Sequence, residues 1–197
     1  MLAMPIRQAE SPAHRPGEGD TLALTPWTPD VFRAPLDFMI AEHGRQSAVC
    51  DIMERLRDNP RHGAQRVTME AARSYLIRDY PLHLADEEED LFPLLQQRCP
   101  REDSLDEVFA LLRREHAADA SLHLAVIEDL ALLIGERALD DPARAFMNLT
   151  VFGETQRRHL AWENAVVIPR AQRYLTETDH LSIGRRMARR RGIEIHD

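Results

Sequence analysis

One sequence pattern occurs twice in this chain, and it constrains the fold more than any other feature. Residues 83–93 read HLADEEEDLFP and residues 159–169 read HLAWENAVVIP, so both copies have the form H-L-A-x-E-x-x-x-x-x-P. A Glu-His dipeptide precedes each copy at a similar distance, with His43 lying 40 residues before the first copy and His116 lying 43 residues before the second. Internal repeats indicate a repeated structural unit. The chain is therefore predicted to contain two halves of similar design.

Short proline-containing breaks divide most of the chain into segments with helical periodicity. Apolar residues recur every three or four positions, as on one face of an α-helix, and the alternating β-branched runs typical of strands are missing. About 30 helical residues form a rod roughly 45 Å long, and short connections between rods favour antiparallel neighbours. We therefore predict the all-α fold class, with an antiparallel up-down-up-down four-helix bundle formed by residues 31–58, 64–98, 104–138 and 142–175.

Local signals mark two of the helix starts. Ser104 and Glu107 have the spacing of a capping box. Asp141 precedes a proline at the first helical position, which is typical of an N-cap. The proline that ends each copy of the repeated motif is expected to bend or stop its helix, because proline lacks the backbone N–H that a helix interior needs.

The two ends of the chain differ in composition from its central part. Residues 1–30 contain five of the twelve prolines and are predicted to form an N-terminal arm. Residues 31–175 are the predicted bundle, and residues 176–197 are a predicted short, arginine-rich C-terminal helix or tail. Five arginines lie between Arg185 and Arg191. We expect a solvated helix end there, with binding to an acidic partner as the alternative.

Composition excludes several classes of function. With 25 basic and 33 acidic residues, the net charge of −8 is opposite in sign to that of a general nucleic-acid binder. No apolar run approaches the roughly 18 residues of a membrane span, and the N-terminal stretch lacks the apolar core of a signal peptide. Only Cys50 and Cys99 are present, which fits a reducing compartment. We expect a cytoplasmic protein with neither nucleic-acid nor membrane partners.

The repeated motif places side chains of metal-binding type in the predicted core. Residues four apart share one helix face, with Cβ atoms roughly 5–6 Å apart, so the histidine and glutamate of each copy can converge on one point. The histidine of each Glu-His dipeptide lies on the apolar stripe of its own helix. The core would then contain four imidazoles and two carboxylates: His43, His83, Glu87, His116, His159 and Glu163.

Bound cations would neutralise the two carboxylates of such a core. Two buried carboxylates without cations are costly to desolvate and repel each other. Nitrogen and oxygen ligands in this number suit borderline transition metals, and carboxylates can bridge two ions. Two metal ions, each bound by two of the histidines and sharing Glu87 and Glu163, would satisfy every group. The spacing leaves open which histidines share an ion.

Other polar residues near these positions have more ordinary roles in our prediction. His123 is expected to be a buried, hydrogen-bonded histidine, with a place in or near the metal shell as the alternative. Cys50 is expected to be a small buried residue rather than a site of oxidation. Tyr80 either packs in the core or orients a ligand. Glu88 and Glu89 are expected on a solvated face, with a path for iron as the alternative.

These motifs resemble the haemerythrin-like, HHE cation-binding domains. The resemblance covers roughly residues 31–175, and the pair of HxxxE elements is its specific part. It implies a four-helix bundle around a non-haem di-iron centre, with two iron ions joined by an oxo or hydroxo bridge and with manganese or zinc as alternatives. By position, the implied ligands are His43, His83, Glu87, His116, His159 and Glu163.

Two departures from the oxygen-carrying haemerythrins affect the expected function. Ala120 stands where those carriers have a second third-helix histidine, and His159 with Glu163 replaces a longer His-to-Asp spacing. The resulting ligand set resembles that of bacterial di-iron proteins linked to iron–sulfur cluster repair and that of the iron-sensing F-box protein.

From this resemblance we expect a di-iron protein that binds, senses or reduces a small oxidant, namely dioxygen, nitric oxide or peroxide. The alternatives are an iron-sensing or iron-storing module, a cluster-repair type of protein, and a structural bundle that holds zinc or nothing. Catalytic turnover and oligomeric state stay open.

Overall fold

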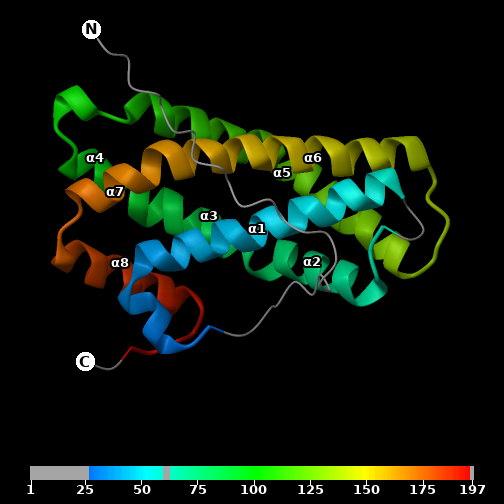
Figure 1. Ribbon diagram of the computed structural model, residues 1–197, viewed down its shortest axis with the longest axis horizontal. Coiled ribbons are helices and arrows are strands. Elements are labelled where there is room, and N and C mark those ends of the chain that lie inside the picture. The colour runs from blue at the N-terminus through cyan, green and yellow to red at the C-terminus, as the bar shows by residue number, and fades with distance from the viewer. Residues whose placement is uncertain (1–26, 60–62, 196–197) are drawn as a thin grey trace, which may run out of the picture.

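The computed structural model describes residues 27–59 and 63–195, so most of the predicted N-terminal arm lies outside the described residues. The described residues form helices and no strand. Four rods run up and down in antiparallel order (Figure 1), which confirms the predicted all-α bundle. None of the helices in this part of the chain combines the length and the apolar character that crossing a membrane requires.

Each rod corresponds to one predicted helical segment. The first rod is α1 (Pro35–Asp58), preceded by the 3₁₀ turn η1 (Pro29–Arg33), and the third is α5 (Asp106–Ile134). The second and fourth rods consist of several helical elements in series. The second contains α2 (Arg66–Arg78), α3 (Tyr80–Ala85), η2 (Asp86–Leu91) and α4 (Phe92–Arg98), followed by the turn η3 (Arg101–Asp103). The fourth contains α6 (Pro142–Trp162), η4 (Glu163–Val167) and α7 (Ile168–Tyr174).

The rods pack as a closed ring, and a further helix covers one end of it. α1 packs against α6, α6 against α5, α5 against α2, and α2 against α1. The further helix, α8 (Glu177–Arg190), packs against η1, α1 and η2 at one end of the bundle (Figure 1). Gly184 permits this close approach, because a Cβ atom there would lie 1.9 Å from the backbone oxygen of Phe32.

The motif prolines do not stop their helices. Pro93 lies in α4 and Pro169 lies in α7, and both rods continue beyond them. The elements η2 and η4 are π-helical turns, in which the residue before the proline donates its N–H to the carbonyl of the motif glutamate five positions earlier, Glu87 or Glu163. A π turn contains one extra residue, which moves the preceding carbonyl groups away from the proline ring. The expectation of a helix stop is therefore wrong, and the repeated motif includes a repeated wide turn.

The two predicted helix starts have different outcomes. Asp141 caps α6 as predicted, because its carboxylate accepts a hydrogen bond from the N–H of Arg144 at 3.0 Å. The predicted capping box of Ser104 and Glu107 is wrong. α5 begins at Asp106, and the Ser104 hydroxyl accepts a hydrogen bond from the N–H of that residue at 3.3 Å.

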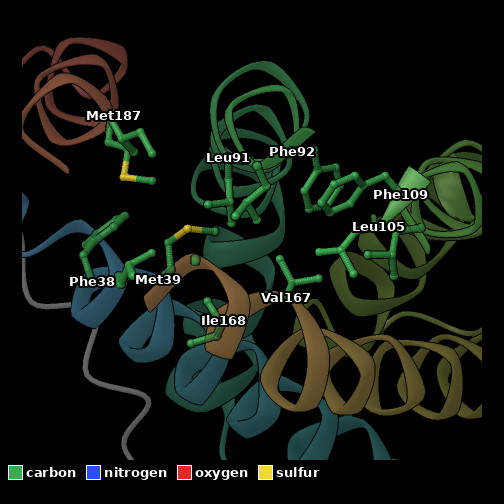
Figure 2. Packing of buried hydrophobic residues seen from close by; sticks show 14 of the residues in the cluster. Phe38, Met39, Leu91, Phe92, Leu105, Phe109, Val167, Ile168 and Met187 are labelled. Carbon is green, nitrogen blue, oxygen red and sulfur yellow. The ribbon is translucent and has the colours of Figure 1, made fainter. Parts of the chain in front are cut away.

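Two apolar clusters fill the bundle, one on each side of the predicted ligand residues. Along α1, Met39 belongs to the first cluster and Val49 to the second, so His43 lies between them. The first cluster lies near α8 and includes Leu91, Phe92, Phe109, Val167, Ile168 and Met187 (Figure 2). The second includes Ile52, Met53, Tyr75, Leu76, Val126 and Phe152. The helix register thus places a polar layer between two apolar ones.

Candidate metal centre

The structure brings all six predicted ligand residues together inside the bundle. Each of them is buried, with at most 8% of its surface exposed. Their ligand atoms form two groups of four, and within each group the atoms lie within 4.8 Å of one another. The groups share both motif glutamates: the first is His43, His83, Glu87 and Glu163, and the second is Glu87, His116, His159 and Glu163. Each group therefore takes both of its histidines from the same half of the chain. The sequence spacing alone had left this pairing open.

Each motif glutamate directs one carboxylate oxygen toward each group. The distances from carboxylate oxygen to Nε2 are 3.2 Å for Glu87 Oε1–His83, 3.7 Å for Glu87 Oε2–His116, 3.5 Å for Glu163 Oε2–His43 and 3.1 Å for Glu163 Oε1–His159. Carboxylates placed in this way can bind one cation with each oxygen. Both glutamates therefore have the orientation of bridging ligands.

The residue after each motif glutamate holds a histidine from the other half of the chain. Asn164 Oδ1 accepts a hydrogen bond from His43 Nδ1–H at 2.7 Å, and Glu88 Oε1 accepts one from His116 Nδ1–H at 2.5 Å. Because both oxygens are acceptors, each imidazole proton resides on Nδ1 and the Nε2 lone pair is free to face the centre. The side chain of Glu88 is nevertheless 37% exposed and that of Glu89 is 67% exposed, so both belong to a solvated face as predicted, and Glu88 has the additional role of binding His116.

The other two histidines differ in their outer contacts. Glu115 Oε2 accepts a hydrogen bond from His159 Nδ1–H at 3.1 Å, whereas His83 Nδ1 is buried without a hydrogen-bond partner. Outer hydrogen bonds of this kind orient metal-binding histidines. Sequence reasoning missed Glu115 and Asn164. The repeat itself offered a signal for Asn164, because it occupies the position that Glu88 occupies in the first copy.

The inner face of the polar layer lacks hydrogen-bond partners. His43 Nε2, Glu87 Oε2 and both carboxylate oxygens of Glu163 are buried and make no hydrogen bond of ordinary geometry. Buried unpaired carboxylate oxygens are costly, and cations would compensate them. The Nε2 atoms of His116 and His159 lie 2.9 Å apart, close to the roughly 3.0 Å expected for two ligand atoms at right angles on a metal with bonds of about 2.1 Å. The donor set therefore fits metal cations.

The pKa values of these residues also indicate that the layer holds more negative charge than the protein itself neutralises. Burial, together with the neighbouring Glu163 carboxylate, raises the pKa of Glu87 well above its usual range. Burial also opposes ionisation of Glu163, but the adjacent His159, whose Nε2 lies 3.1 Å from Glu163 Oε1, outweighs it and lowers the pKa of Glu163. Burial lowers the pKa of His83 and of His116, which keeps both imidazoles neutral, as metal ligands must be. The protein's own charges thus compensate only one of the two carboxylates.

A second polar layer lies one helical turn from the histidines, toward the second apolar cluster. Gln156 accepts hydrogen bonds from the Tyr80 hydroxyl, at 3.2 Å, and from the Gln46 side chain, and it donates one to Asp119 at 3.0 Å. Tyr80 therefore combines core packing with a hydrogen bond, and burial raises its pKa and keeps the phenol protonated. Sequence reasoning did not find this layer, because each of its members is unremarkable in isolation.

Two residues considered as additions to the site have structural roles. His123 donates a hydrogen bond from Nε2 to the carbonyl oxygen of Leu76 at 2.9 Å and stacks on Phe152, as expected of a hydrogen-bonded histidine. Cys50 is 1% exposed, and burial raises the pKa of its thiol to about 12. A thiol that stays protonated is a poor nucleophile, so Cys50 packs as a small buried residue.

The arginine-rich end of α8 is only partly solvated. The side chains of Arg190 and Arg191 are only 19% and 6% exposed, and both form ion pairs with Asp86. Arg190 also pairs with Glu89 at 2.9 Å. The prediction of a solvated helix end is therefore wrong for Arg190 and Arg191, which contact acidic residues of the same chain, whereas Arg185 and Arg189 are exposed as predicted.

A family model for the Hemerythrin HHE cation binding domain matches residues 34–171, which is more than half of the chain. The chain belongs to this family. The matched range includes all six residues of the polar layer. It ends before α8. A comparison with curated proteins gives no match.

Proposed function

We propose that this haemerythrin-family protein binds two iron ions in its His/Glu layer and uses them to bind, sense or reduce dioxygen, nitric oxide or peroxide. Membership of a cation-binding family and the buried His/Glu clusters support metal binding. One observation carries the proposal of two ions: the ligand atoms divide into two groups of four that share both glutamates.

In this proposal each histidine pair would hold one ion, and Glu87 and Glu163 would be shared by both ions. The protein would then supply four ligand atoms to each ion, and a metal that accepts more than four ligands could also bind a small molecule. Iron accepts imidazole and carboxylate ligands, and other divalent metals do so as well. When bound, iron would supply one-electron redox chemistry and coordination positions for the small molecule.

The protein's own groups position these ligands and limit the access of water. Asn164, Glu88 and Glu115 bind the Nδ1 atoms of three histidines, which directs Nε2 toward the ions. The apolar clusters on both sides separate the layer from bulk solvent. Four neutral imidazoles and two carboxylates carry less negative charge than a carboxylate-rich ligand set. We expect this charge to favour ferrous over ferric iron.

The test uses full-length protein purified without oxygen and loaded with ferrous iron. We expect two irons per chain by elemental analysis, and a change in the absorption spectrum of the reduced protein with at least one of nitric oxide, dioxygen and hydrogen peroxide. Glu163→Gln removes a bridging carboxylate at nearly constant volume and should lower the content below one iron per chain. Glu154→Gln changes an exposed glutamate of the same rod and should retain both irons.

Two results would count against different parts of this proposal. Fewer than one iron per wild-type chain, or zinc bound in preference to iron, would contradict the di-iron centre. Two irons per chain without a spectral response to any of the three molecules would contradict the oxidant function and leave metal binding in place.

A further inference from the structure

The first copy of the motif carries an acidic run, DEEED at residues 86–90, from which Glu87 alone joins the two ligand groups. Asp86 and Asp90 are only 0% and 3% exposed, so their charges are buried in the protein. Buried carboxylates need cationic partners, because an unpaired buried charge is strongly unfavourable. These partners come from α8, which lies beyond the family match.

Three arginines at the end of α8 contact the acidic run. Arg190 Nη1 lies 2.7 Å from Asp86 Oδ1 and 2.6 Å from Asp90 Oδ2. Arg191 Nη2 lies 2.8 Å from Asp86 Oδ2. Arg186 also forms an ion pair with Asp90. The buried carboxylates are thus compensated from a helix that is about 100 residues away in the sequence.

These ion pairs fall on the π turn η2, which carries Glu87. Asp86 directly precedes Glu87 and Asp90 lies three residues after it, so the contacts with α8 lie on both sides of the glutamate. Glu88, which binds His116 Nδ1, belongs to the same turn. Any movement of η2 would therefore displace one bridging carboxylate and one outer partner of a histidine.

Further contacts hold α8 itself in place. The Arg191 guanidinium lies over the ring of Phe38 at 4.7 Å, and Met187 packs in the first apolar cluster (Figure 2). At the start of the helix, Thr176 and Asp179 form a capping box. The arginines are thus presented by a helix that is fixed at both ends.

We propose that α8 is a positioning element of the metal centre, in which Arg190 and Arg191 hold η2 so that Glu87 bridges the two ligand groups. The inference rests on the proposed metal function. Without these guanidinium groups, the buried carboxylates of residues 86–90 repel one another, and η2 relaxes toward solvent. Glu87 then moves away from both histidine pairs, so the loss affects both ions.

The experiment compares two neighbouring arginines of the full-length protein. Arg190→Gln removes a contact with η2, whereas Arg189→Gln removes the same charge from an exposed residue of the same helix. Both variants and the wild type are loaded with ferrous iron, and its release to an excess of chelator is followed by absorbance. We expect release from Arg190→Gln to be at least about tenfold faster than from the wild type, the scale of outer-contact effects on metal sites. Its absorption spectrum should also shift, while Arg189→Gln matches the wild type in both measurements.

Thermal unfolding of the metal-free proteins separates positioning from folding. If Arg190→Gln unfolds at a lower temperature but releases iron and absorbs light as the wild type does, α8 only stabilises the fold and the inference is overturned. If Arg190→Gln does not fold, Arg186→Gln replaces it, because Arg186 also pairs with Asp90 of η2 and its side chain is 42% exposed. Iron release from this variant identical to that of the wild type then overturns the inference. Failure of the wild type to retain iron would instead contradict the proposed function.

Discussion

The two copies of the motif differ in the contacts that hold their glutamates. Around Glu87 the wide turn is acidic and is held by ion pairs with α8. Around Glu163 the turn reads ENAVV, and Val167 and Ile168 pack in the first apolar cluster (Figure 2). Both turns nevertheless form the same backbone hydrogen bond to the carbonyl of their glutamate. Leu91 and Phe92, the equivalent residues of the first copy, belong to the same cluster. Both turns are therefore held by apolar burial, and the turn around Glu87 is held in addition by ion pairs with α8.

The difference shows that the symmetry of the ligand set is stricter than that of its surroundings. The equivalent position in the two copies is Asp86 in one and Trp162 in the other, and the outer partner is Glu88 in one and Asn164 in the other. Both copies share the first apolar cluster with Met187 of α8, which lies beyond the matched domain, but the ion pairs with α8 fall on the first copy. Substitutions at equivalent positions should therefore have unequal effects.

The largest difference in unfolding free energy is expected between substitutions of Asp86 and of Trp162. Asp86 is fully buried, while Trp162 is 44% exposed. Asp86→Ala leaves the Arg191 guanidinium buried without its carboxylate, and losing one partner of a buried ion pair costs about 3 kcal/mol or more of unfolding free energy. Trp162→Ala should cost about 1 kcal/mol or less, as for most surface substitutions. Urea unfolding of the metal-free proteins measures both, and equal costs would refute the contrast.

A smaller difference, in metal affinity, is expected between substitutions of the residues that bind His116 Nδ1 and His43 Nδ1. Glu88 binds its histidine with a charged oxygen and Asn164 binds its histidine with a neutral one. Removing an outer partner lowers metal affinity about 10-fold to 100-fold. We expect Glu88→Ala near the upper limit and Asn164→Ala near the lower one, because a charged acceptor makes the stronger hydrogen bond. Competition with a chromophoric chelator gives both affinities, and the reverse order would show that charge is not the deciding factor.

The sequence predicted those parts of the molecule that depend on local spacing. The i, i+4 pairing of His83 with Glu87, and of His159 with Glu163, required only a helix, and the structure brings all four side chains into one layer. The consequence of the motif prolines was not predictable in the same way, because a missing N–H is compatible with a stop, a kink or a wide turn.

The role of the arginine-rich segment lay beyond sequence reasoning for a different reason. A run of charges has the same composition whether it is solvated or paired inside the fold. Arg190 and Asp86 are more than 100 residues apart, so only the tertiary structure shows that they meet at 2.7 Å. The exposed fraction of the Arg190 side chain, 19%, is the quantity that decides between the two readings.

The smallest effect concerns the start of α8, the helix whose arginines contact the first copy. Two hydrogen bonds from Arg98, at 2.8 and 2.9 Å, and the contacts with Thr176 hold the pKa of Asp179 well below its usual range. A carboxylate with a lowered folded-state pKa contributes stability above its unfolded pKa of about 3.9, and this contribution is lost as the pH falls through the folded-state pKa. Asp179→Asn should therefore be less stable than the wild type at neutral pH by about 1 kcal/mol, the scale of a helix cap.

The pH dependence of that difference identifies its origin. Urea unfolding should give a gap between Asp179→Asn and the wild type that narrows as the pH falls below about 3.9, because the carboxylate of the unfolded chain then takes up a proton that the native carboxylate still excludes. Asp140→Asn, at an exposed aspartate, should have the same unfolding free energy as the wild type at neutral and at acidic pH. A gap that does not change with pH would mean that Asp179 acts through packing instead of charge. If iron release is also unchanged in Asp179→Asn, the dependence of the first copy lies in the arginine end of α8 alone.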